Sequence, residues 1–351
     1  MNYTIITNHC GGLFSASLSR QRYFRSVGIY AAGILDGLRF IINFVAMDVK
    51  QLSAEEYAAI FVRPVSPYTT ADFCALNSHK VAEMRHLAFY SPGSSKALAG
   101  IIVGRRDGEE LWRSPFSAPF GGLDCVRPLR LEEVTAIYRA LLGHCGGHLL
   151  VTLSPEFYAP SLTAHQIYAM KALGFDMSLW LNHSYPTSRF ASFEAALGDT
   201  ARKHFRRASR EGYEFDADAS LEEAYSVISR NRRERGYPLA LSVDELRQTS
   251  ALIPQHYLVL RLDGEAVAAA ICYRLSERVM QIIYWGHVAD CSGQYPMSVL
   301  VHEVFGFALS QGYDTVDIGP STSPEAPNES LAAFKESLGA VASLKVAGGR
   351  F

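Results

Sequence analysis

The sequence predicts an α/β (α+β) protein built from two similar halves. Each half repeats one order of elements, in which strands are followed by a polar loop, a helix, a strand, a second helix and a last strand. An Asp-Gly-Glu turn occurs at 107–109 and again at 263–265, and the second helix ends in Leu-Gly at 173–174 and at 338–339. A repeated order of this length indicates an internal duplication and therefore two domains in tandem.

The composition agrees with two domains of ordinary size. The chain has 351 residues, of which 48% are hydrophobic, so each half can bury its own core. We expect an N-terminal domain over 1–190 and a C-terminal domain over 191–351. The net charge of −2 provides no basic field for DNA. Six scattered cysteines without C-x-x-C spacing predict reduced thiols, a cytoplasmic location and no metal site.

The most apolar window of the chain lies at 27–49. Asp36 and Arg39 stand in its middle, and each would cost roughly 2.5–3.5 kcal/mol at the centre of a bilayer. We therefore expect a buried helix followed by a strand, and no transmembrane segment. Docking of this window on a membrane face is the alternative. The first residues lack the positive charge of a secretory signal.

The remaining elements follow from hydrophobic period, caps and turns. In the first half we expect helices at 53–60, 69–85, 131–147 and 160–174, and strands at 86–91, 97–107, 109–114, 148–154 and 175–186. After a linker near 187–199, we expect helices at 202–209, 221–235, 243–251, 297–312 and 331–340, and strands at 213–218, on both sides of the turn at 263–264, and at 315–319.

Several motifs of the second half carry a family resemblance. They are RKHFRRASREGY at 202–213, GQYPM at 293–297, DIG at 317–319 and NESLAAFKESLGA at 328–340. Through them the stretch 195–347 resembles the FemAB-like branch of the GNAT acyltransferases. The resemblance implies two tandem GNAT-like domains, each a mixed, mainly antiparallel sheet flanked by helices. It also implies transfer of an acyl group from acetyl-CoA or another acyl-CoA.

The loop before the helix at 297 is the predicted donor site. Free backbone N–H groups at the helix start would hold a pyrophosphate, and a glycine would allow its close approach. The predicted cofactor-binding residues are Gly293, Gln294, Tyr295, Met297 and Ser298. The alternative is an ordinary turn with proline at the first helical position. The loop departs from the family's phosphate pattern, Gln/Arg-x-x-Gly-x-Gly/Ala.

A second group of candidates follows the strand at 315–319. Asp317, Asn328 and Phe334 would bind substrate at a strand end that faces the cleft between the domains, and Lys335 would pair with an anionic group. In the alternative, Asp317 and Asn328 serve caps and turns, Phe334 belongs to the core, and Lys335 is solvated.

The loop SPFSAPFGG at 114–122 holds in the first half the place that the donor loop holds in the second. It is similar to loops in GNAT-like proteins of surface-glycan gene clusters. Phe116 and Phe120 would form apolar walls of a substrate site, and Ser114 and Ser117 would bind a sugar or amine acceptor. The alternative is a rigid bend whose glycines meet backbone demands.

The basic helix at 202–210 has two interpretations. It would receive the phosphates of a nucleotide-linked or tRNA-linked substrate, or it is a solvated charged face. Enzymes of the Fem type that use aminoacyl-tRNA often carry a long helical hairpin in the second domain. The segment between Arg235 and Tyr257 is too short for one, which disfavours a tRNA donor without excluding it.

The transfer needs a group that removes a proton from the amine. Tyr284, Glu303 and Lys335 are the predicted catalytic residues, and His287 and His302 flank the same region, although each can be structural instead. A backbone N–H of residues 283–286 would stabilise the oxyanion.

The sequence thus predicts transfer of an acyl or aminoacyl group to an amine. The resemblance places the acceptor, a small molecule or glycan precursor, in cell-envelope glycan or peptidoglycan precursor synthesis. Because a fold does not fix an activity, the alternative is a catalytically degenerate GNAT fold that binds a ligand or acts as a scaffold.

Overall fold

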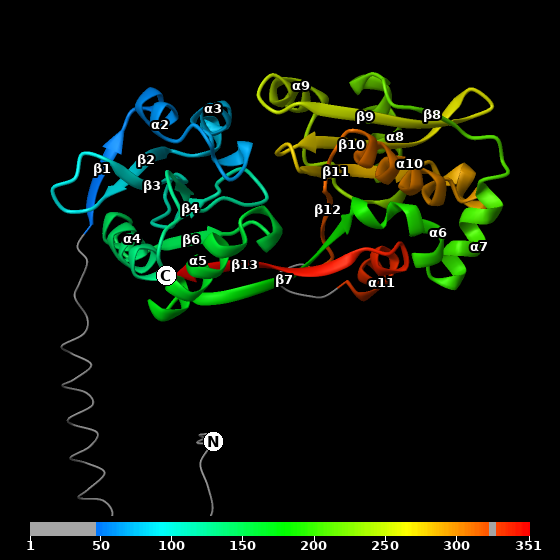
Figure 1. Cartoon of the computed structure of the whole chain (residues 1–351). Helices are drawn as coiled ribbons and strands as arrows, with labels where there is room; N and C mark the ends of the chain where they lie inside the picture. The colour runs from blue at the N-terminus through cyan, green and yellow to red at the C-terminus, as the bar shows by residue number, and fades with distance from the viewer. Residues whose placement is uncertain (1–46, 323–327) are drawn as a thin grey trace, which may run out of the picture. The chain divides into compact units, whose positions relative to one another are not determined.

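One mixed sheet runs through both halves of the protein (Figure 1). The computed structural model describes residues 47–322 and 328–351. The helix and strand expected at 27–49 lie outside the described residues, except for the last residues of that window.

In the first half, residues 47–190, α-helices stand before and after a run of consecutive strands. The strands are β1 (Asp48–Leu52), β2 (Glu83–Tyr90), β3 (Ala97–Arg105), β4 (Trp112–Ser114), β5 (Asp124–Cys125), β6 (Leu149–Thr152) and β7 (Asp176–Pro186). The α-helices are α2 (Ala54–Ile60), α3 (Ala71–Leu76), α4 (Leu131–His144) and α5 (Pro160–Ala172), with 3-10 turns η1 (Pro67–Thr69), η2 (Ser78–Lys80) and η3 (Glu156–Tyr158).

The second half, residues 191–351, follows the same plan. Its strands are β8 (Glu214–Asp216), β9 (Gln255–Leu262), β10 (Glu265–Arg274), β11 (Val279–His287), β12 (Thr315–Pro320) and β13 (Val341–Arg350). Its α-helices are α6 (Phe193–Ala196), α7 (Asp199–Ala208), α8 (Leu221–Arg235), α9 (Val243–Ser250), α10 (Pro296–Ser310) and α11 (Glu329–Ser337); η4 (Thr187–Ser192) and η5 (Ala289–Gln294) are 3-10 turns.

Local sequence signals explain the helix ends. Ser53 and Glu56 form a capping box that starts α2 where it was expected. The helix expected at 69–85 was wrong in length, because α3 ends at Leu76 and β2 begins at Glu83. Asn77 ends α3, and its side-chain amide donates to the carbonyl oxygen of Phe73 (2.9 Å). The residues beyond η2 instead pair with β3.

The duplication is visible in the strand pairing. In each half a short parallel contact joins the strand before the special loop to the strand after the next helix, β4 to β6 and β11 to β12. The two Asp-Gly turns are not equivalents, however. The turn at 107–108 joins β3 to β4, whereas the turn at 263–264 joins β9 to β10, one strand earlier in the plan.

The last strands of the two halves are exchanged. β13 of the second half pairs with β6 of the first, and β7 of the first half pairs with β12 of the second. β7 and β13 also pair with each other along most of their length, from Val341 with Ser184 to Gly349 with Asp176. The sequence pattern did not predict this exchange, which makes the sheet continuous between the halves.

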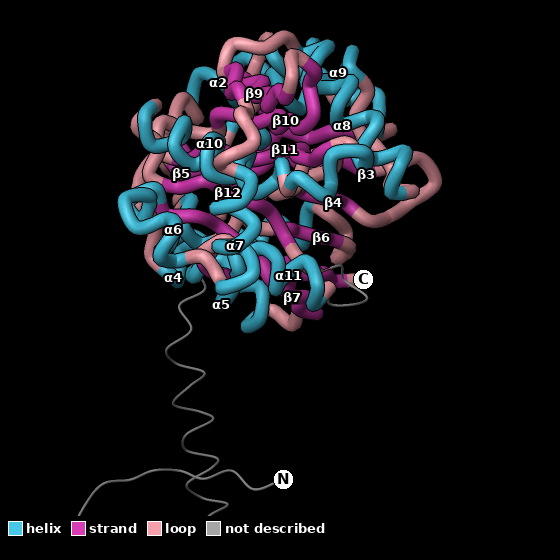
Figure 2. Tube along the Cα trace, turned by 90° about the vertical axis from the view of Figure 1, so that its right-hand side faces the viewer, coloured by secondary structure: helices cyan, strands magenta, loops and turns pink. Residues whose placement is uncertain are grey.

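Helices cover both faces of the second half's sheet (Figure 2). Alternate residues of β9 and β10 point to opposite faces, as the two-residue period of a strand requires. Leu258, Leu260 and Ala270 pack with α10 on one face, while Val259 and Ile271 pack with α8 and α9 on the other. The second of these cores also contains Tyr68, Phe73 and Phe120, so the first half supplies part of it.

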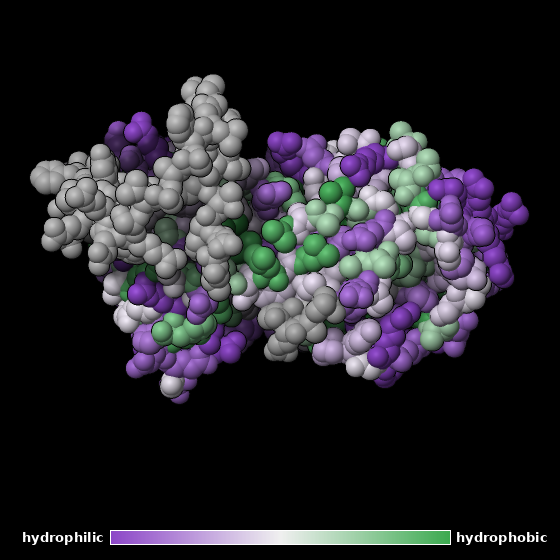
Figure 3. Space-filling model, turned by 90° about the horizontal axis from the view of Figure 1, so that it is seen from below, coloured by the Kyte–Doolittle hydropathy of each residue, from purple (hydrophilic) through white to green (hydrophobic). Residues whose placement is uncertain are grey.

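Strands β7 and β13, which we call the crossing strands, are less well covered by helices. Figure 3 shows the face below them, where apolar residues gather near the middle. Leu179 of β7 and Leu344 of β13 are 59% and 52% exposed. In the described part of the chain, these two apolar side chains of the crossing strands are therefore open to solvent.

A buried hydrogen-bond network forms around Asp317, which is 1% exposed. One carboxylate oxygen accepts from the hydroxyl of Tyr158 (2.9 Å) and the amide of Gln281 (2.8 Å). The other accepts from the amide of Asn182 and the backbone N–H of Gly319, both at 3.0 Å. The network therefore ties β12 to β11, β7 and η3.

Tyr68 extends this network into the loop region of the first half. Its hydroxyl donates to the side-chain oxygen of Gln281 (2.7 Å), and Gln281 in turn donates to Asp317. Each group of this chain has a partner, as burial demands.

We predict that Asp317→Ala lowers the free energy of unfolding by several kcal/mol. The substitution would leave buried donors unpaired, and each unpaired group costs about 1–3 kcal/mol. Urea denaturation followed by circular dichroism measures this loss. The control is Asp314→Ala, which removes an exposed ion pair with Arg278 and should cost about 0–1 kcal/mol. Equal losses in the two variants would contradict a special role of the network.

Candidate functional site

The candidate site lies where β11 and β12 separate. Their parallel pairing is confined to Val279–Gln281 and Thr315–Asp317, whereas β11 continues to His287. The last residues of β11 thus have no strand partner on the β12 side. In the first half the matching separation is closed, because Gly121 forms a bridge with Leu153.

A β-bulge marks β11 just beyond this separation. Ile271 of β10 pairs with Tyr284 and Cys272 pairs with Ile282, so Ile283 is an extra residue in β11. Bulges redirect the backbone and are frequent beside active sites. The bulge lies in the segment predicted to supply an oxyanion-binding N–H, and that role stays a prediction.

The predicted donor loop forms the start of α10. Tyr295 adopts a left-handed conformation (φ 55°) and is the N-cap, and Pro296 occupies the first helical position. The cap lacks a side-chain hydrogen bond, so the start of α10 relies on other groups to satisfy its N–H donors. Met297 and Ser298 lie in the first turn and are half-buried.

The basic helix α7 lies against this loop. The His204 ring stacks on Tyr295 with centroids 3.8 Å apart, and the Arg207 guanidinium lies 5.5 Å from the centroid of the same ring. Gly293 is exposed, and the carbonyl oxygen of Gln294 accepts from the hydroxyl of Tyr213 (3.1 Å). The structure therefore joins two candidates that the sequence presented separately.

Lys335 is buried rather than solvated, with 3% exposure. Its ammonium donates to the carbonyl oxygens of Gly319 (2.8 Å) and Pro320 (3.0 Å) at the end of β12. Burial lowers the pKa of Lys335 to about 8, although Asp317 opposes the shift. Neighbouring Phe334 is 37% exposed and meets the Trp285 ring edge-on at 6.4 Å.

Asn328 caps the helix that carries Lys335. Its side-chain oxygen accepts from the backbone N–H of Leu331 (3.0 Å). This capping role is the alternative interpretation of Asn328 given above. Asp317 likewise has a structural role, because its oxygens are occupied by the buried network.

The predicted catalytic residues have separate surroundings. The Tyr284 hydroxyl accepts from the backbone N–H of Leu241 (3.1 Å), beside α9. Glu303 contacts His302 (3.0 Å), whose ring packs among the phenylalanines of η4, α6 and α7. Lys335 binds the end of β12 instead.

A further polar chain lies next to Lys335 and was missed in the sequence. The Nδ1 atom of buried His183 is 2.9 Å from the hydroxyl of Ser321, and its Nε2 atom is 3.5 Å from a carboxylate oxygen of Glu336. Burial lowers the pKa of His183, which favours the neutral form of its ring.

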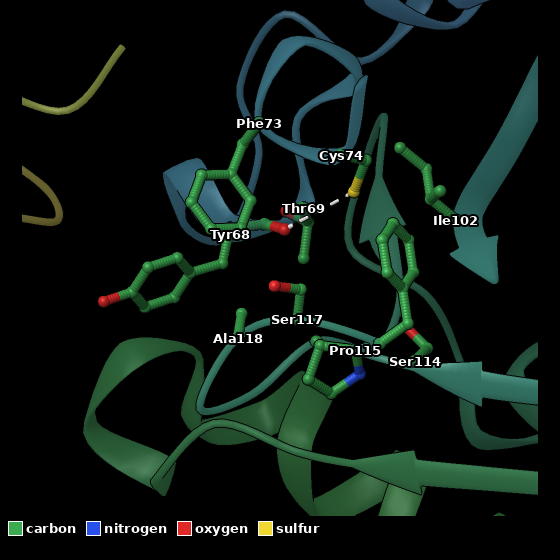
Figure 4. A pocket seen from close by; sticks show the side chains of 11 residues that line it. Tyr68, Thr69, Phe73, Cys74, Ile102, Ser114, Pro115, Ser117 and Ala118 are labelled. Carbon is green, nitrogen blue, oxygen red and sulfur yellow. Dashed lines mark hydrogen bonds between the residues drawn. The ribbon is translucent and has the colours of Figure 1, made fainter. Parts of the chain in front are cut away.

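The loop at 114–122 is packed into the first half. Ser114 accepts from the backbone N–H of Gly122 (3.2 Å), Phe116 belongs to the core over β3, and Phe120 contacts the Tyr68 ring at 5.3 Å. Figure 4 shows the space beside this loop, with Tyr68 extending away from Cys74. That space measures about 10 Å³, room for about one water molecule.

A larger pocket lies between the halves, with a volume of about 250 Å³. We call it the interhalf pocket. Its walls are Tyr68, Phe73, Leu76, Asn77, His79, Lys80, Ser117, Ala118 and Pro119 from the first half, and Leu241, Glu245, Gln248, Thr249, Tyr273 and Ile283 from the second. Of the predicted loop, residues 117–119 reach it. Sequence carried no signal for the rest, because the walls meet only through contact between the halves.

Comparison with known proteins shows a family model and solved structures that resemble this chain. Residues 199–329 match the family model of the acetyltransferase (GNAT) domain. FemX shares 9% identity over 87% of this chain and 97% of its own, with a TM-score of 0.62. Residues 199–329 are thus similar to a GNAT domain, and the chain has a fold like that of FemX. No curated protein sequence matches it significantly.

Two further structures have the same fold as this GNAT-fold chain. The C-terminal domain of a putative lysylphosphatidylglycerol synthetase from Agrobacterium fabrum is 14% identical over 85% of this chain and 91% of its own, with a TM-score of 0.54. L-PGS from Bacillus licheniformis is 16% identical over 86% and 93%, also with a TM-score of 0.54. These likenesses confirm the predicted fold of two tandem GNAT-like halves.

Other sequence-based expectations concern metals and membranes. The described residues contain no group of three or more His, Cys, Asp or Glu side chains arranged to hold a metal ion. The cysteines in this part of the chain carry free thiols; they are Cys74, Cys125, Cys145, Cys272 and Cys291. Within residues 47–322 and 328–351, every helix is too short or too polar to cross a bilayer.

We predict that Lys335 makes a contribution to the free energy of unfolding that grows between pH 8 and about 10.4, the ordinary pKa of lysine. In this window the unfolded chain binds more protons at Lys335 than the folded chain does, so this contribution to stability increases with pH. Buried Lys345, whose pKa is also lowered to about 8, contributes in the same direction, whereas burial raises the pKa of the thiols of Cys74, Cys125 and Cys145 to about 12, so their contribution falls as the pH rises. The change in stability across this window should therefore be less favourable in Lys335→Met than in the wild type.

Urea denaturation at pH 8.0 and at about pH 9.5 measures the effect. Lys203→Met, which changes an exposed lysine of α7, is the control and should keep the wild-type pH dependence. A pH dependence unchanged by Lys335→Met would show that this amine stays charged in the folded chain throughout the window.

Proposed function

We propose that the protein is an N-acyltransferase that moves an acyl or aminoacyl group onto an amine acceptor used in cell-envelope glycan or peptidoglycan precursor synthesis. One observation carries the proposal. The end of β11, which pairs with β10 but has no strand partner on the β12 side, carries a bulge at Ile283 and adjoins a helix whose N-terminus lacks a side-chain cap. Extended backbone beside a helix N-terminus suits a ligand with an extended, amide-containing arm and a pyrophosphate, which is the chemistry of an acyl-CoA.

The donor would bind along β11 with its pyrophosphate at α10. The positive end of the α10 dipole and the Arg207 guanidinium, held over Tyr295, would together balance the phosphate charge. The acyl carbonyl would then lie near the bulge. A backbone N–H there would stabilise the oxygen anion that forms when the amine attacks the carbonyl carbon.

The proton of the attacking amine also needs a path. His183 suits this role better than the predicted trio, because burial favours the neutral form of its ring and the ring contacts both Ser321 and half-exposed Glu336. Ser321 follows the strand end that Lys335 holds. The protonated Lys335 would add positive charge near the reacting carbonyl, and the thiolate of the donor would leave as a thiol.

There are two alternatives to an acyl-CoA-dependent transferase. The donor loop does not match the family's phosphate pattern, which favours either a donor other than an acyl-CoA or a degenerate domain that only binds a ligand. An aminoacyl-tRNA would use the exposed basic residues of α7 for phosphate contacts.

We predict that acetyl-CoA binds the purified protein and that Arg207→Gln weakens binding roughly 10-fold, because a charge-assisted contact is lost. Isothermal titration calorimetry measures both constants. The matched control is Arg206→Gln, one residue earlier on the same helix, where the guanidinium instead pairs with Glu194 (2.5 Å). The control variant should bind acetyl-CoA as the wild type does.

Absence of acetyl-CoA binding would exclude this donor, and charged tRNA would be the next ligand to titrate. Binding of neither donor would contradict an acyltransferase and leave the scaffold alternative. Equal weakening in both arginine variants would place the donor elsewhere on α7.

A further inference from the structure

We propose that the crossing strands carry a binding site for a monovalent carboxylate, built around the ammonium group of Lys345 and completed by the hydroxyl of Ser343. Both residues belong to β13. The site goes beyond the proposed function, because it recognises an anionic group and not the amine that would be acylated. Its residues belong neither to the donor loop nor to the walls of the interhalf pocket.

Lys345 and Ser343 lie on the same face of β13. Residues two apart along a strand point to one face, so the two side chains are neighbours there. Leu344, the residue between them, points the other way and is 52% exposed, whereas Lys345 is only 8% exposed. Across the strand pair, Lys345 is opposite Trp180 of β7 and Ser343 is opposite Asn182. The strands therefore hold the ammonium and the hydroxyl side by side within the fold.

The Lys345 ammonium lacks an acceptor in the part of the chain that the structure describes. It forms neither a hydrogen bond nor an ion pair there, and its contact is with the Trp180 ring, whose centroid is 5.8 Å away. Burial lowers the pKa of Lys345 to about 8, although Asp317 opposes the shift, so most of this amine is protonated at pH 7. A buried positive charge without an acceptor is unfavourable, and an anionic ligand would remove that cost.

Lys335 shows how this protein satisfies a buried lysine from its own chain. Lys335 is 3% exposed and its pKa is also lowered to about 8. Its ammonium, however, donates to the carbonyl oxygens of Gly319 (2.8 Å) and Pro320 (3.0 Å). The surroundings of Lys345 supply no such oxygens among the described residues. The missing acceptor of Lys345 is therefore assigned to a ligand.

The Ser343 hydroxyl is a second buried group without a partner among the described residues. The amide of Asn182, on the opposite strand, already donates to Asp317 (3.0 Å). One ammonium and one hydroxyl on the same face can each donate to one oxygen of a carboxylate. The two unpartnered donors of β13 thus match the two oxygens of this group.

The charge near Lys345 favours a monovalent anion over a phosphate. The buried Asp317 carboxylate already places one negative charge close to the ammonium, although the two groups form no ion pair. A carboxylate ligand would add one further negative charge, which Lys345 balances. A phosphate would add nearly two. The other buried lysine of this region, Lys335, is held by backbone carbonyls and cannot balance the second charge.

An NMR titration of the full-length protein with N-acetylalanine tests the site, because this probe has one carboxylate and no amine to be acylated. We expect the wild type to bind it, and Lys345→Met to weaken binding roughly 10-fold, since a charge-assisted hydrogen bond is lost. Ser343→Ala should weaken binding roughly 3-fold. The matched control is Lys335→Met, which removes a buried lysine that has protein acceptors and should leave binding unchanged.

Thermal melts supply a second measurement and show whether each variant is folded. Without ligand, Lys345→Met should melt above the wild type, because an apolar side chain replaces a buried charge that has no partner. Lys335→Met should melt below it, because two carbonyl groups lose their donor. N-acetylalanine should raise the melting temperature of the wild type but not that of Lys345→Met. A Lys345→Met variant that melts below the wild type would overturn the proposal, since its ammonium would then be satisfied within the folded chain.

Two further probes identify what is recognised. The neutral amide of N-acetylalanine should bind more weakly than the acid, and equal binding would show that the carboxylate is not read. Inorganic phosphate should also bind more weakly, and tighter binding would overturn the choice of a monovalent anion. Binding of the acid that Lys345→Met leaves unchanged would place the ligand elsewhere. These results do not depend on whether acetyl-CoA binds, so the site and the proposed function can fail separately.

Discussion

The buried carboxylate of Asp317 is the point on which the two halves depend. It accepts hydrogen bonds from η3, β7, β11 and its own strand, and Gln281 passes the connection on to Tyr68. A buried carboxylate is tolerated only when its lone pairs are satisfied, so these donors must be held in place together. The same contacts fix the point at which β11 and β12 part, which is where the candidate site begins.

The site is therefore a product of the junction rather than of one half. The second half contributes the bulged strand and the start of α10, while the first half contributes the 3-10 turns and loop that wall the interhalf pocket. In the first half the equivalent separation is closed by the bridge at Gly121. One copy of the duplicated unit thus has an open strand edge, and the other supplies walls of the interhalf pocket.

Sequence reasoning found most elements because their signals are local. The capping boxes at Ser53 and Ser242, the proline at the start of α10 and the period of the helices are visible without tertiary structure. The strand exchange has no local signal, since β7 and β13 have the sequence pattern of a strand whichever half they pair with. Buried Lys335 and His183 were misjudged or missed for the same reason, because their surroundings come from distant strands. The loop at 114–122 was predicted to form a substrate site, but its two aromatic rings pack in the hydrophobic cores.

The exchange of last strands has a consequence for how the protein is made on the ribosome. When the first half has emerged, β6 can pair with β4 but still lacks its second neighbour, β13, which lies near the far end of the chain. At that stage β7 likewise lacks both of its neighbouring strands, β12 and β13. An emerging N-terminal half therefore carries open strand edges throughout synthesis of the second half, and such edges invite pairing with other chains. Completion of the sheet must follow translation of nearly the whole sequence, so slow synthesis prolongs an aggregation-prone intermediate.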